Sequence, residues 1–381
     1  MTPSQAAPDL LHSEAEEDLR AAVRSLLTDR GAPASVLAGA ESGRPHDPDL
    51  WQALATGMGT AGLLVPEKLG GQGASARESA VVLEELGRSV AAVPYLTSAV
   101  LAVSALLGCD TAREEVAGPL AALAGGHRVG ALAVPLPTAP GTHLAPAVRA
   151  EPTGTGRALL SGEITAVAGA PGADLLLVPA DSGLYAVDTG AEGVRIASLT
   201  PLDLTRPLAR VTLTGAPATL LAEADRARAA VETALLTGAG LLASEQLGLA
   251  EWCLAETVRY TGERHQFGRP VGSFQALKHR LAALWLDVAS ARAAARGAAD
   301  ALATGAPDTA IAVAVAQSYC AEVAVRAAQE CVQLHGGIGM TWEHPAHLYL
   351  KRAKADETAL GTPGRHRQAL AALADLPAPP P

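Results

Sequence analysis

The segment 260–275 is the part of the chain whose residue types most clearly suit chemistry. It has the pattern of a helix end, a Gly/Pro turn and a new helix start, with Arg264 before the turn and Gln275 after it. Both phenylalanines of the chain, Phe267 and Phe274, fall within it. An arginine beside the free N–H groups of a helix start suits a phosphate or pyrophosphate. The segment therefore predicts an anion site.

A second informative segment spans residues 333–345 and reads Gln-Leu-His-Gly-Gly-Ile-Gly-Met-Thr-Trp-Glu-His-Pro. Gly336 and Gly337 allow a backbone to approach another surface closely. His335 and His344 bracket the glycines and His347 follows, and histidine is a common metal ligand. No cysteine or carboxylate completes a familiar ligand spacing, so we predict no metal site and a polar interfacial role.

Composition limits the classes of protein that remain. The 381 residues are 49% hydrophobic and 18% charged, which is less charge than the usual quarter and indicates extensive buried surface. A net charge of −10 argues against a nucleic-acid binder. Residues 1–12 lack a secretory pattern, and we find no uninterrupted apolar span. The four cysteines show no CxxC spacing: Cys109, Cys253, Cys320 and Cys331. Together these observations predict a cytoplasmic protein that binds no membrane.

The order of patterns along the chain predicts an α+β fold. Apolar residues recur at helical spacing in 11–125, where Asp49 is a candidate helix cap before Leu50. Short apolar runs separated by Gly, Pro, Asp and Thr follow in 128–221, and long helical patterns return in 222–373. We predict three domains: an N-terminal helical domain (1–125), a middle β-domain (126–221) and a C-terminal helical domain (222–381).

These motifs together resemble the acyl-CoA dehydrogenase family of flavoproteins. The resemblance rests on Arg264-x-x-Phe-Gly and the 333–345 segment, in the right order and spacing. It extends to Val65-Pro-Glu-Lys-Leu-Gly-Gly-Gln-Gly and Leu83-Glu-Glu-Leu-Gly, and so covers nearly the whole chain. The variants around His335 and Trp342 look most like an actinobacterial branch involved in acyl-CoA and steroid side-chain oxidation. The family implies a C-terminal four-helix bundle, and FAD held in extended form at a dimer interface, usually within a tetramer.

The resemblance also implies which residues contact the cofactor. The expected pyrophosphate contacts are Arg264, His265 and Gln266, with Phe274 and Gln275 nearby. The ADP part of a neighbouring subunit's FAD would meet Gln333, Leu334, His335, Gly336 and Gly337. Thr362 and Gly364 would approach the cofactor near the chain end.

The chain departs from the family at the catalytic base. Family members remove an α-proton with a carboxylate while the β-hydride passes to FAD. The position that matches the usual base is Leu360, which cannot accept a proton. The position used by some relatives falls at Gly238. Glu357 and Glu245 are the remaining candidates, although Glu245 is more simply interpreted as a buried or interfacial carboxylate.

Three functions fit this combination. The first is α,β-dehydrogenation of an acyl thioester, on CoA or a carrier protein, with electrons passed to an electron-transfer flavoprotein. The second is a non-catalytic subunit of a heteromeric acyl-CoA dehydrogenase, whose partner carries the base. The third is a flavin-dependent monooxygenase on the same scaffold, because a flavin hydroperoxide needs no α-proton abstraction. Homo- and hetero-oligomers, dimeric or tetrameric, both remain open.

Overall fold

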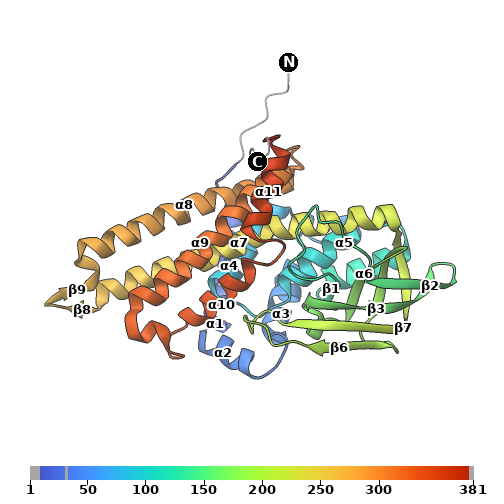
Figure 1. Cartoon of the computed structure of the whole chain (residues 1–381), viewed down its shortest axis with the longest axis horizontal. Helices are drawn as coiled ribbons and strands as arrows, with labels where there is room; N and C mark the ends of the chain where they lie inside the picture. Colours follow the sequence, from blue (N-terminus) through green and yellow to red (C-terminus); the bar gives the residue numbers. More distant parts are fainter. Residues whose placement is uncertain (1–8, 31–32, 377–381) are drawn as a thin grey trace, which may run out of the picture.

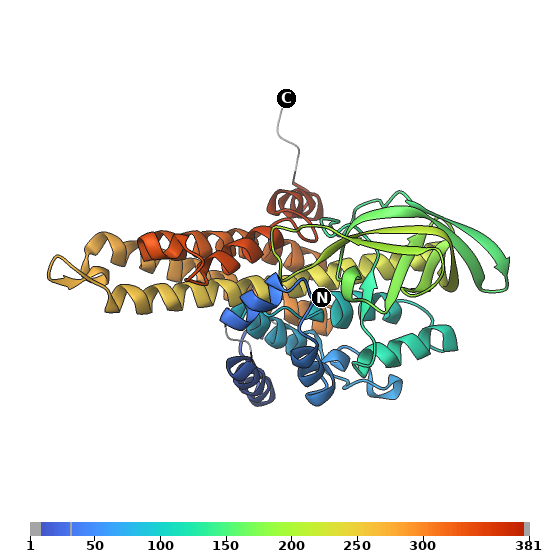
Figure 2. The ribbon, with the colours of Figure 1, turned by 90° about the horizontal axis from the view of Figure 1, so that it is seen from below.

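The computed structural model describes residues 9–30 and 33–376, and it places a helical bundle beside a β-sheet (Figure 1). Most of the segment 1–12 lies outside the described residues. The N-terminal part is helical and packs along one side of the bundle (Figure 2). Its helices are α1 (Glu14–Arg30), α2 (Pro33–Glu41), α3 (Pro48–Gln52), α4 (Ala76–Arg88), α5 (Val103–Leu107) and α6 (Glu114–Ala124), with a π-helical segment, η4 (Tyr95–Ala102), before α5.

Local side-chain chemistry explains where two of these helices begin. Ser75 starts α4 with a capping box: its hydroxyl accepts from the N–H of Arg77, and Glu78 accepts from the N–H of Ser75. The cap of α3 is Asp47, which accepts from the N–H groups of Asp49 and Leu50. The prediction of Asp49 as this cap was wrong, because Pro48 occupies the first helical position, where its missing N–H is tolerated.

The middle of the chain forms one seven-stranded sheet. Its strands are β1 (Gly130–Leu132), β2 (Val148–Gly154), β3 (Arg157–Ala168), β4 (Leu175–Ala180), β5 (Gly183–Asp188), β6 (Val194–Ser198) and β7 (Leu208–Glu223). They lie in the order β1-β4-β5-β7-β3-β2, and β6 also pairs with β7. Only the β1–β4 pairing is parallel. The sheet has a core of its own, separate from the large core shared by the helices.

The C-terminal part is the bundle. It consists of α7 (Ala224–Glu263), α8 (Gln275–Thr304), α9 (Thr309–His335), α10 (Ala346–Asp356) and α11 (Pro363–Leu373). A hairpin of β8 (His265–Gln266) and β9 (Arg269–Pro270) joins α7 to α8 at the end farthest from the sheet (Figure 1). The predicted α+β fold is confirmed, and the domain boundaries at 125/126 and 221/222 stay a prediction.

Helix α4 packs closely on α7 because glycines meet at the crossing. A Cβ on Gly87 would lie 2.1 Å from the carbonyl oxygen of Glu245, and a Cβ on Gly248 would lie 1.9 Å from that of Glu84. Both distances are far below van der Waals contact, so no larger residue fits without separating the helices. The N-terminal helices are thereby held on the bundle.

One segment, Thr309–Met340, is long and apolar enough to cross a membrane by length and composition alone. It consists mainly of α9, which packs against α7, α8, α10 and α11. Just over half of its most apolar window is buried inside the protein (56%), as in the core helix of a bundle. Length and composition are therefore weak evidence that this segment spans a membrane.

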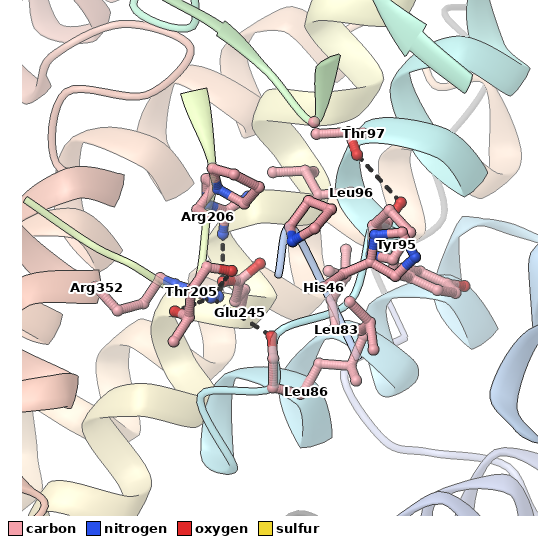
Figure 3. A pocket seen from close by; sticks show the side chains of 16 residues that line it. His46, Leu83, Leu86, Tyr95, Leu96, Thr97, Thr205, Arg206, Glu245 and Arg352 are labelled. Atoms are coloured by element: carbon pink, nitrogen blue, oxygen red, sulfur yellow. Dashed lines mark hydrogen bonds and ion pairs between the residues drawn. The ribbon is translucent and has the colours of Figure 1, made fainter. Parts of the chain in front are cut away.

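A buried network of ion pairs joins the sheet domain to the bundle. Arg352 of α10 pairs with Asp203, from the loop after β6, and with Glu245 of α7. Arg206, from the same loop as Asp203, donates to Glu245 at 2.5 Å. Figure 3 shows both arginines converging on Glu245 beside a narrow cavity of about 30 Å³. The network holds α10, and the segment that follows it, against the sheet domain and against α7.

The pKa values of two carboxyl groups in this network are shifted in opposite directions. Burial alone would raise the pKa of Asp203, but Arg352 and the Thr205 hydroxyl together lower it below its ordinary value. Burial raises the pKa of Asp356 well above its ordinary value, and repulsion from Glu245 adds to this effect. Asp356 is completely buried and neither carboxyl oxygen has a hydrogen-bond partner among the described residues, but Nη2 of Arg206 lies 3.3 Å from its Oδ1 and opposes the upward shift. The raised pKa favours the protonated form of Asp356, and in that form Arg352 and Arg206 balance Asp203 and Glu245.

We therefore expect two isosteric substitutions in one cluster to differ sharply. Asp203→Asn removes an ionised partner of Arg352 and should lower the free energy of unfolding at pH 7 by about 3–5 kcal/mol. Asp356→Asn mimics the protonated form that burial favours and should change it by less than about 1 kcal/mol. Urea unfolding of both variants measures the difference.

The pH dependence provides the check on this assignment. The lowered pKa of Asp203 contributes stability that is present above its unfolded pKa and is lost as pH falls through the folded value. The raised pKa of Asp356 has the opposite effect, so stability declines as pH rises from its unfolded value towards its folded one. Equal losses in the two variants at pH 7 would contradict the assignment.

Candidate functional site

The predicted anion site lies on the hairpin at the far end of the bundle (Figure 1). Arg264 ends α7, and His265 and Gln266 form β8; all three side chains are exposed. Phe267 forms the hairpin turn with a φ of +54° and is 90% exposed. Phe274 is partly buried against the Phe267 ring, with centroids 6.1 Å apart. The hairpin thus presents polar groups and one aromatic ring outward.

The chemistry of these groups fits a diphosphate. No carboxylate among the described residues pairs with Arg264, so its charge is available. Helix α8 starts at Gln275 with Phe274 as its N-cap, and no side chain caps its first N–H groups. An uncapped start of a long helix beside an unpaired arginine favours an anion. The FAD pyrophosphate is the group that these residues would hold.

The glycine segment lies at the same end of the bundle. Helix α9 ends at His335, and Gly336 follows with a φ of +65° and a ψ of −138°, which only glycine adopts readily. A Cβ on Gly336 or Gly337 would meet no atom within 4 Å, so the backbone there is open to a ligand or partner. Gln333 is exposed and Leu334 is partly buried.

His335 is the buried member of this predicted set. Its ring stacks on Tyr260 with centroids 4.3 Å apart, and its Nδ1 lies 2.6 Å from the carbonyl oxygen of Cys331. Its Nε2 faces Oε1 of Glu256 at 3.8 Å. His335 therefore connects the end of α9 to α7, directly before the glycine segment. Glu256 was missed by the sequence analysis because it lies on another helix.

Glu256, His335 and His344 lie close enough together to resemble a metal site. Burial lowers the pKa of His344, so its ring is neutral. Its Nδ1 accepts from the N–H of Ala346 at 3.2 Å, which leaves the proton on Nε2, 3.6 Å from Glu256. Glu256 also accepts two hydrogen bonds from Arg259. A protonated Nε2 and a carboxylate already held by arginine favour a hydrogen-bonded cluster over ion coordination.

Thr362 and Gly364 lie away from this end of the bundle. Thr362 caps α11 by accepting from the N–H of Arg365 at 3.3 Å, and both Thr362 and Gly364 are exposed. Figure 1 shows α11 beside the sheet side of the bundle rather than near the hairpin. The predicted cofactor contacts therefore form two separate groups within one chain.

Both family base positions meet at one point in space, and both are apolar. Leu360 is completely buried and has a φ of +54°, which is unusual for a leucine. A Cβ on Gly238 of α7 would lie 3.1 Å from Cδ1 of Leu360 and 2.4 Å from Cδ2 of Leu101. A side chain at position 238 would therefore collide with Leu101 and press on Leu360.

The backbone around Leu360 is closed as well. Its N–H donates to the carbonyl oxygen of Leu136 at 2.7 Å, and its carbonyl oxygen lies 2.9 Å from Nε2 of His366. A Cβ on Gly361 would lie 2.7 Å from Cβ of Ala139. The segment after β1 thus presses directly onto the segment that follows α10.

The two alternative carboxylates are both held in ion pairs. Glu245 is fully buried and accepts from Arg206 and Arg352, which together lower its pKa despite its burial. Glu357 forms an ion pair with Lys354, one turn earlier. The interpretation of Glu245 as a buried structural carboxylate agrees with this geometry.

A cavity of about 650 Å³ lies between the sheet and the first turns of α7. Apolar side chains of Val134, Ile164, Val231 and Leu235 line it, and residues 141–147 form one complete wall. Neither Leu360 nor Gly238 lines it. The lining comes closest to the two base positions at Leu235, one turn before Gly238, and at Pro135, next to Leu136.

Comparison with known proteins identifies the class. The family model "Acyl-CoA dehydrogenase, N-terminal domain" matches residues 13–123, and "Acyl-CoA dehydrogenase, C-terminal domain" matches residues 227–374. The chain therefore belongs to the acyl-CoA dehydrogenase family. It is a flavoprotein oxidoreductase of this family, and its cofactor is FAD.

Particular relatives cover almost the whole chain. It is 37% identical over 351 residues to acyl-CoA dehydrogenase IpdE2 of Mycolicibacterium smegmatis, covering 92% of this chain and 96% of that one. Among solved structures, the ChsE4–ChsE5 complex of Mycobacterium tuberculosis superposes with a TM-score of 0.85 at 32% identity, covering 97% and 100%. A Tcur3481–Tcur3483 steroid acyl-CoA dehydrogenase variant gives 0.83 at 31% identity, covering 95% and 98%.

We expect Arg264→Ala to weaken FAD retention, because it removes a charge-assisted contact to the pyrophosphate worth about 1.5–3 kcal/mol. The dissociation constant for FAD, measured by flavin fluorescence, should rise by about 10- to 150-fold. Arg326→Ala is the matched control, since Arg326 is an exposed bundle arginine already paired with Asp287 at 2.7 Å. Unchanged FAD affinity in Arg264→Ala would reject the assignment.

Proposed function

We propose that this chain takes part in α,β-dehydrogenation of an acyl thioester as the base-free subunit of a hetero-oligomer. The partner chain supplies the carboxylate that removes the α-proton. This chain supplies FAD contacts at the hairpin and the glycine segment, and helical surface for assembly. An electron-transfer flavoprotein is the proposed acceptor of the electrons, and a CoA thioester is the proposed substrate.

One observation carries this proposal: the two base positions converge on a single sealed, apolar contact. A Cβ on Gly238 would lie 3.1 Å from Cδ1 of Leu360, and the N–H of Leu360 donates to the carbonyl oxygen of Leu136. Leu360 is completely buried among apolar side chains and backbone, and position 238 has no side chain, which fits a chain that does not carry the base at this point.

The relatives support a paired arrangement. The solved relative at 32% identity is titled a complex of two different chains, ChsE4 and ChsE5. FadE34 of Mycobacterium tuberculosis is 36% identical over 95% of this chain, and the match spans only 47% of FadE34. A relative of about twice this length has room for two such units in one polypeptide. Both cases are consistent with two dissimilar halves working together.

The chemistry assigns separate tasks to the two chains. The α-carbon loses a proton to the partner's carboxylate, the β-carbon loses a hydride, and the carbon–carbon bond between them becomes double. FAD, when bound, accepts the hydride. Arg264 and the start of α8 hold the negative pyrophosphate, which fixes the position of the cofactor. The exposed backbone at Gly336 and Gly337 is free to approach the cofactor across the interface.

We expect Leu360→Glu to produce no dehydrogenase activity in the isolated chain. The new carboxylate would be buried in an apolar contact without a partner, so the free energy of unfolding should fall by several kcal/mol, on the order of 3 kcal/mol or more. Leu360→Met is the volume-conserving control and should cost less than about 1.5 kcal/mol. Flavin reduction by a panel of acyl-CoAs, with urea unfolding, measures both effects; thioester-dependent reduction in Leu360→Glu would contradict a sealed crevice.

The subunit role is tested on the native assembly. The tagged chain, purified from its own cells, should bring down a stoichiometric second chain with a carboxylate at the position matching Leu360 or Gly238. Replacing that carboxylate with the corresponding amide should abolish turnover and leave the assembly intact. Full activity from an assembly that contains only this chain would reject the proposal.

A further inference from the structure

The glycine segment continues into a loop whose two ends meet. Residues 336–343 (the glycine loop) begin with the 3-10 helix η7 (Gly336–Met340) and end before His344. The rings of His335 and His344, which flank the loop, lie with centroids 4.1 Å apart. A surface loop with adjoining ends is a compact unit whose shape depends on the contacts at its base. The contacts at that base therefore decide how the loop presents its glycines.

Contacts elsewhere in the loop shape its second half. The N–H and the hydroxyl of Thr341 both donate to the carbonyl oxygen of Ile338, at 3.0 and 2.8 Å. Trp342 packs on His347, with ring centroids 4.4 Å apart, and Lys351 lies over the Trp342 ring at 4.2 Å. These contacts hold the second half of the loop on α10. The first half, which carries the two exposed glycines, follows directly from the end of α9.

One carboxylate of α7 spans the base of the loop. Oε1 of Glu256 lies 3.8 Å from Nε2 of His335 and 3.6 Å from Nε2 of His344. These separations exceed the length of a direct hydrogen bond, so the two contacts depend on charge. Arg259, one turn along α7, donates to both carboxylate oxygens of Glu256, at 2.9 and 2.5 Å. Glu256 is thus held in front of both flanking rings.

The surroundings of His335 favour its charged form. Nδ1 lies 2.6 Å from the carbonyl oxygen of Cys331 and 3.7 Å from its sulfur, Nε2 faces Glu256, and Tyr260 stacks on the ring. Both ring nitrogens therefore face acceptors, which suits the imidazolium. Burial lowers the pKa of His335, but Cys331 and Glu256 more than offset this and raise it above its ordinary value. Cys253, and after it His335, lower the pKa of the Cys331 thiol to about 5 despite its burial.

We propose that Glu256 is a positioning residue that closes the base of the glycine loop through His335 and His344. Closure holds the backbone of Gly336 and Gly337 in the place where it receives the ADP part of FAD. The closure stands on the geometry of this chain. Only the identity of the ligand rests on the proposed function, in which this chain supplies FAD contacts at the glycine segment.

The pH dependence of closure follows from the groups that meet there. The charge of His335 supports closure below about pH 6.5 and is lost as pH rises through its raised pKa. Burial and His335 lower the pKa of His344, so protonation of His344 adds a repelling charge only as pH falls through that lowered value. Arg259 lowers the pKa of Glu256, and Cys331 keeps its negative charge above about pH 5. Closure should therefore weaken as pH rises above about 6.5.

Hydrogen exchange of the full chain without FAD, followed by mass spectrometry at about pH 6.5, tests the closure itself. Glu256→Gln keeps the shape of the side chain and removes its charge. The amides of the glycine loop should then exchange about fivefold faster, while those of α4 keep their rates. Glu322→Gln is the matched control, because Glu322 is an α9 carboxylate that pairs with Arg367 of α11 at 2.6 Å. Its loop amides should exchange at the rate of the unmodified chain.

FAD binding to the same variants tests the positioning role. The FAD dissociation constant of Glu256→Gln, measured by flavin fluorescence at about pH 6.5, should be about fivefold higher than that of the unmodified chain. In the unmodified chain this constant should rise with pH as His335 loses its proton. In Glu256→Gln the rise should begin at lower pH, because the ring has lost a carboxylate that raises its pKa. A general loss of stability would not move this profile.

Three results would overturn the proposal. Unchanged loop exchange in Glu256→Gln would contradict the closure, and faster exchange with unchanged FAD affinity would contradict the positioning role. Protection of the loop by one equivalent of Zn²⁺ would identify the cluster as a metal site instead. Failure of the subunit proposal leaves the exchange rates unaffected, because they are measured without FAD, partner or turnover. An error in the FAD assignment shows separately, as unchanged FAD affinity in Arg264→Ala.

Discussion

The arrangement of this protein depends on the buried charges around Arg352. Arg352 and Arg206 hold Asp203 and Glu245 where the sheet domain, α7 and α10 meet. A fully buried charge is tolerated only when its partners are fixed, so this cluster sets the relative position of the three parts. The segment that carries Leu360 follows α10 directly. Its contact with Leu136, in the segment after β1, is therefore a consequence of how the charged cluster docks the sheet domain on the bundle.

The sequence predicted the architecture well because the signals for it are local. Helical periodicity, short strand-like runs and the paired motifs around Arg264 and Gly336 lie within short segments, and they indicated the order of helices and strands correctly. The charged cluster was not predicted, because Asp203, Glu245 and Arg352 are far apart in the chain and only the fold brings them together. For the same reason Glu256 was not linked to His335. Leu360 and Gly238 were each identified as lacking a base, but their mutual contact required coordinates.

We propose that this chain keeps the family fold but does not carry the family's catalytic base. The exposed, open surfaces are the hairpin with Arg264 and the backbone at Gly336 and Gly337. The point at which family members carry out proton abstraction is filled by Leu360, Leu101 and the backbone around Gly361. The proposed subunit role thus rests on exposed groups suited to FAD and assembly, together with an apolar residue at the position that matches the usual base.

The most direct test is an anaerobic titration of the purified chain, loaded with FAD, with a panel of acyl-CoAs, compared with the same titration of the native assembly. The visible flavin absorbance reports the transfer of the β-hydride. The account predicts that no thioester bleaches the isolated chain, whereas at least one bleaches the assembly. Bleaching of the isolated chain by any thioester would contradict the central claim, because it would require a base that a sealed Leu360 contact does not provide.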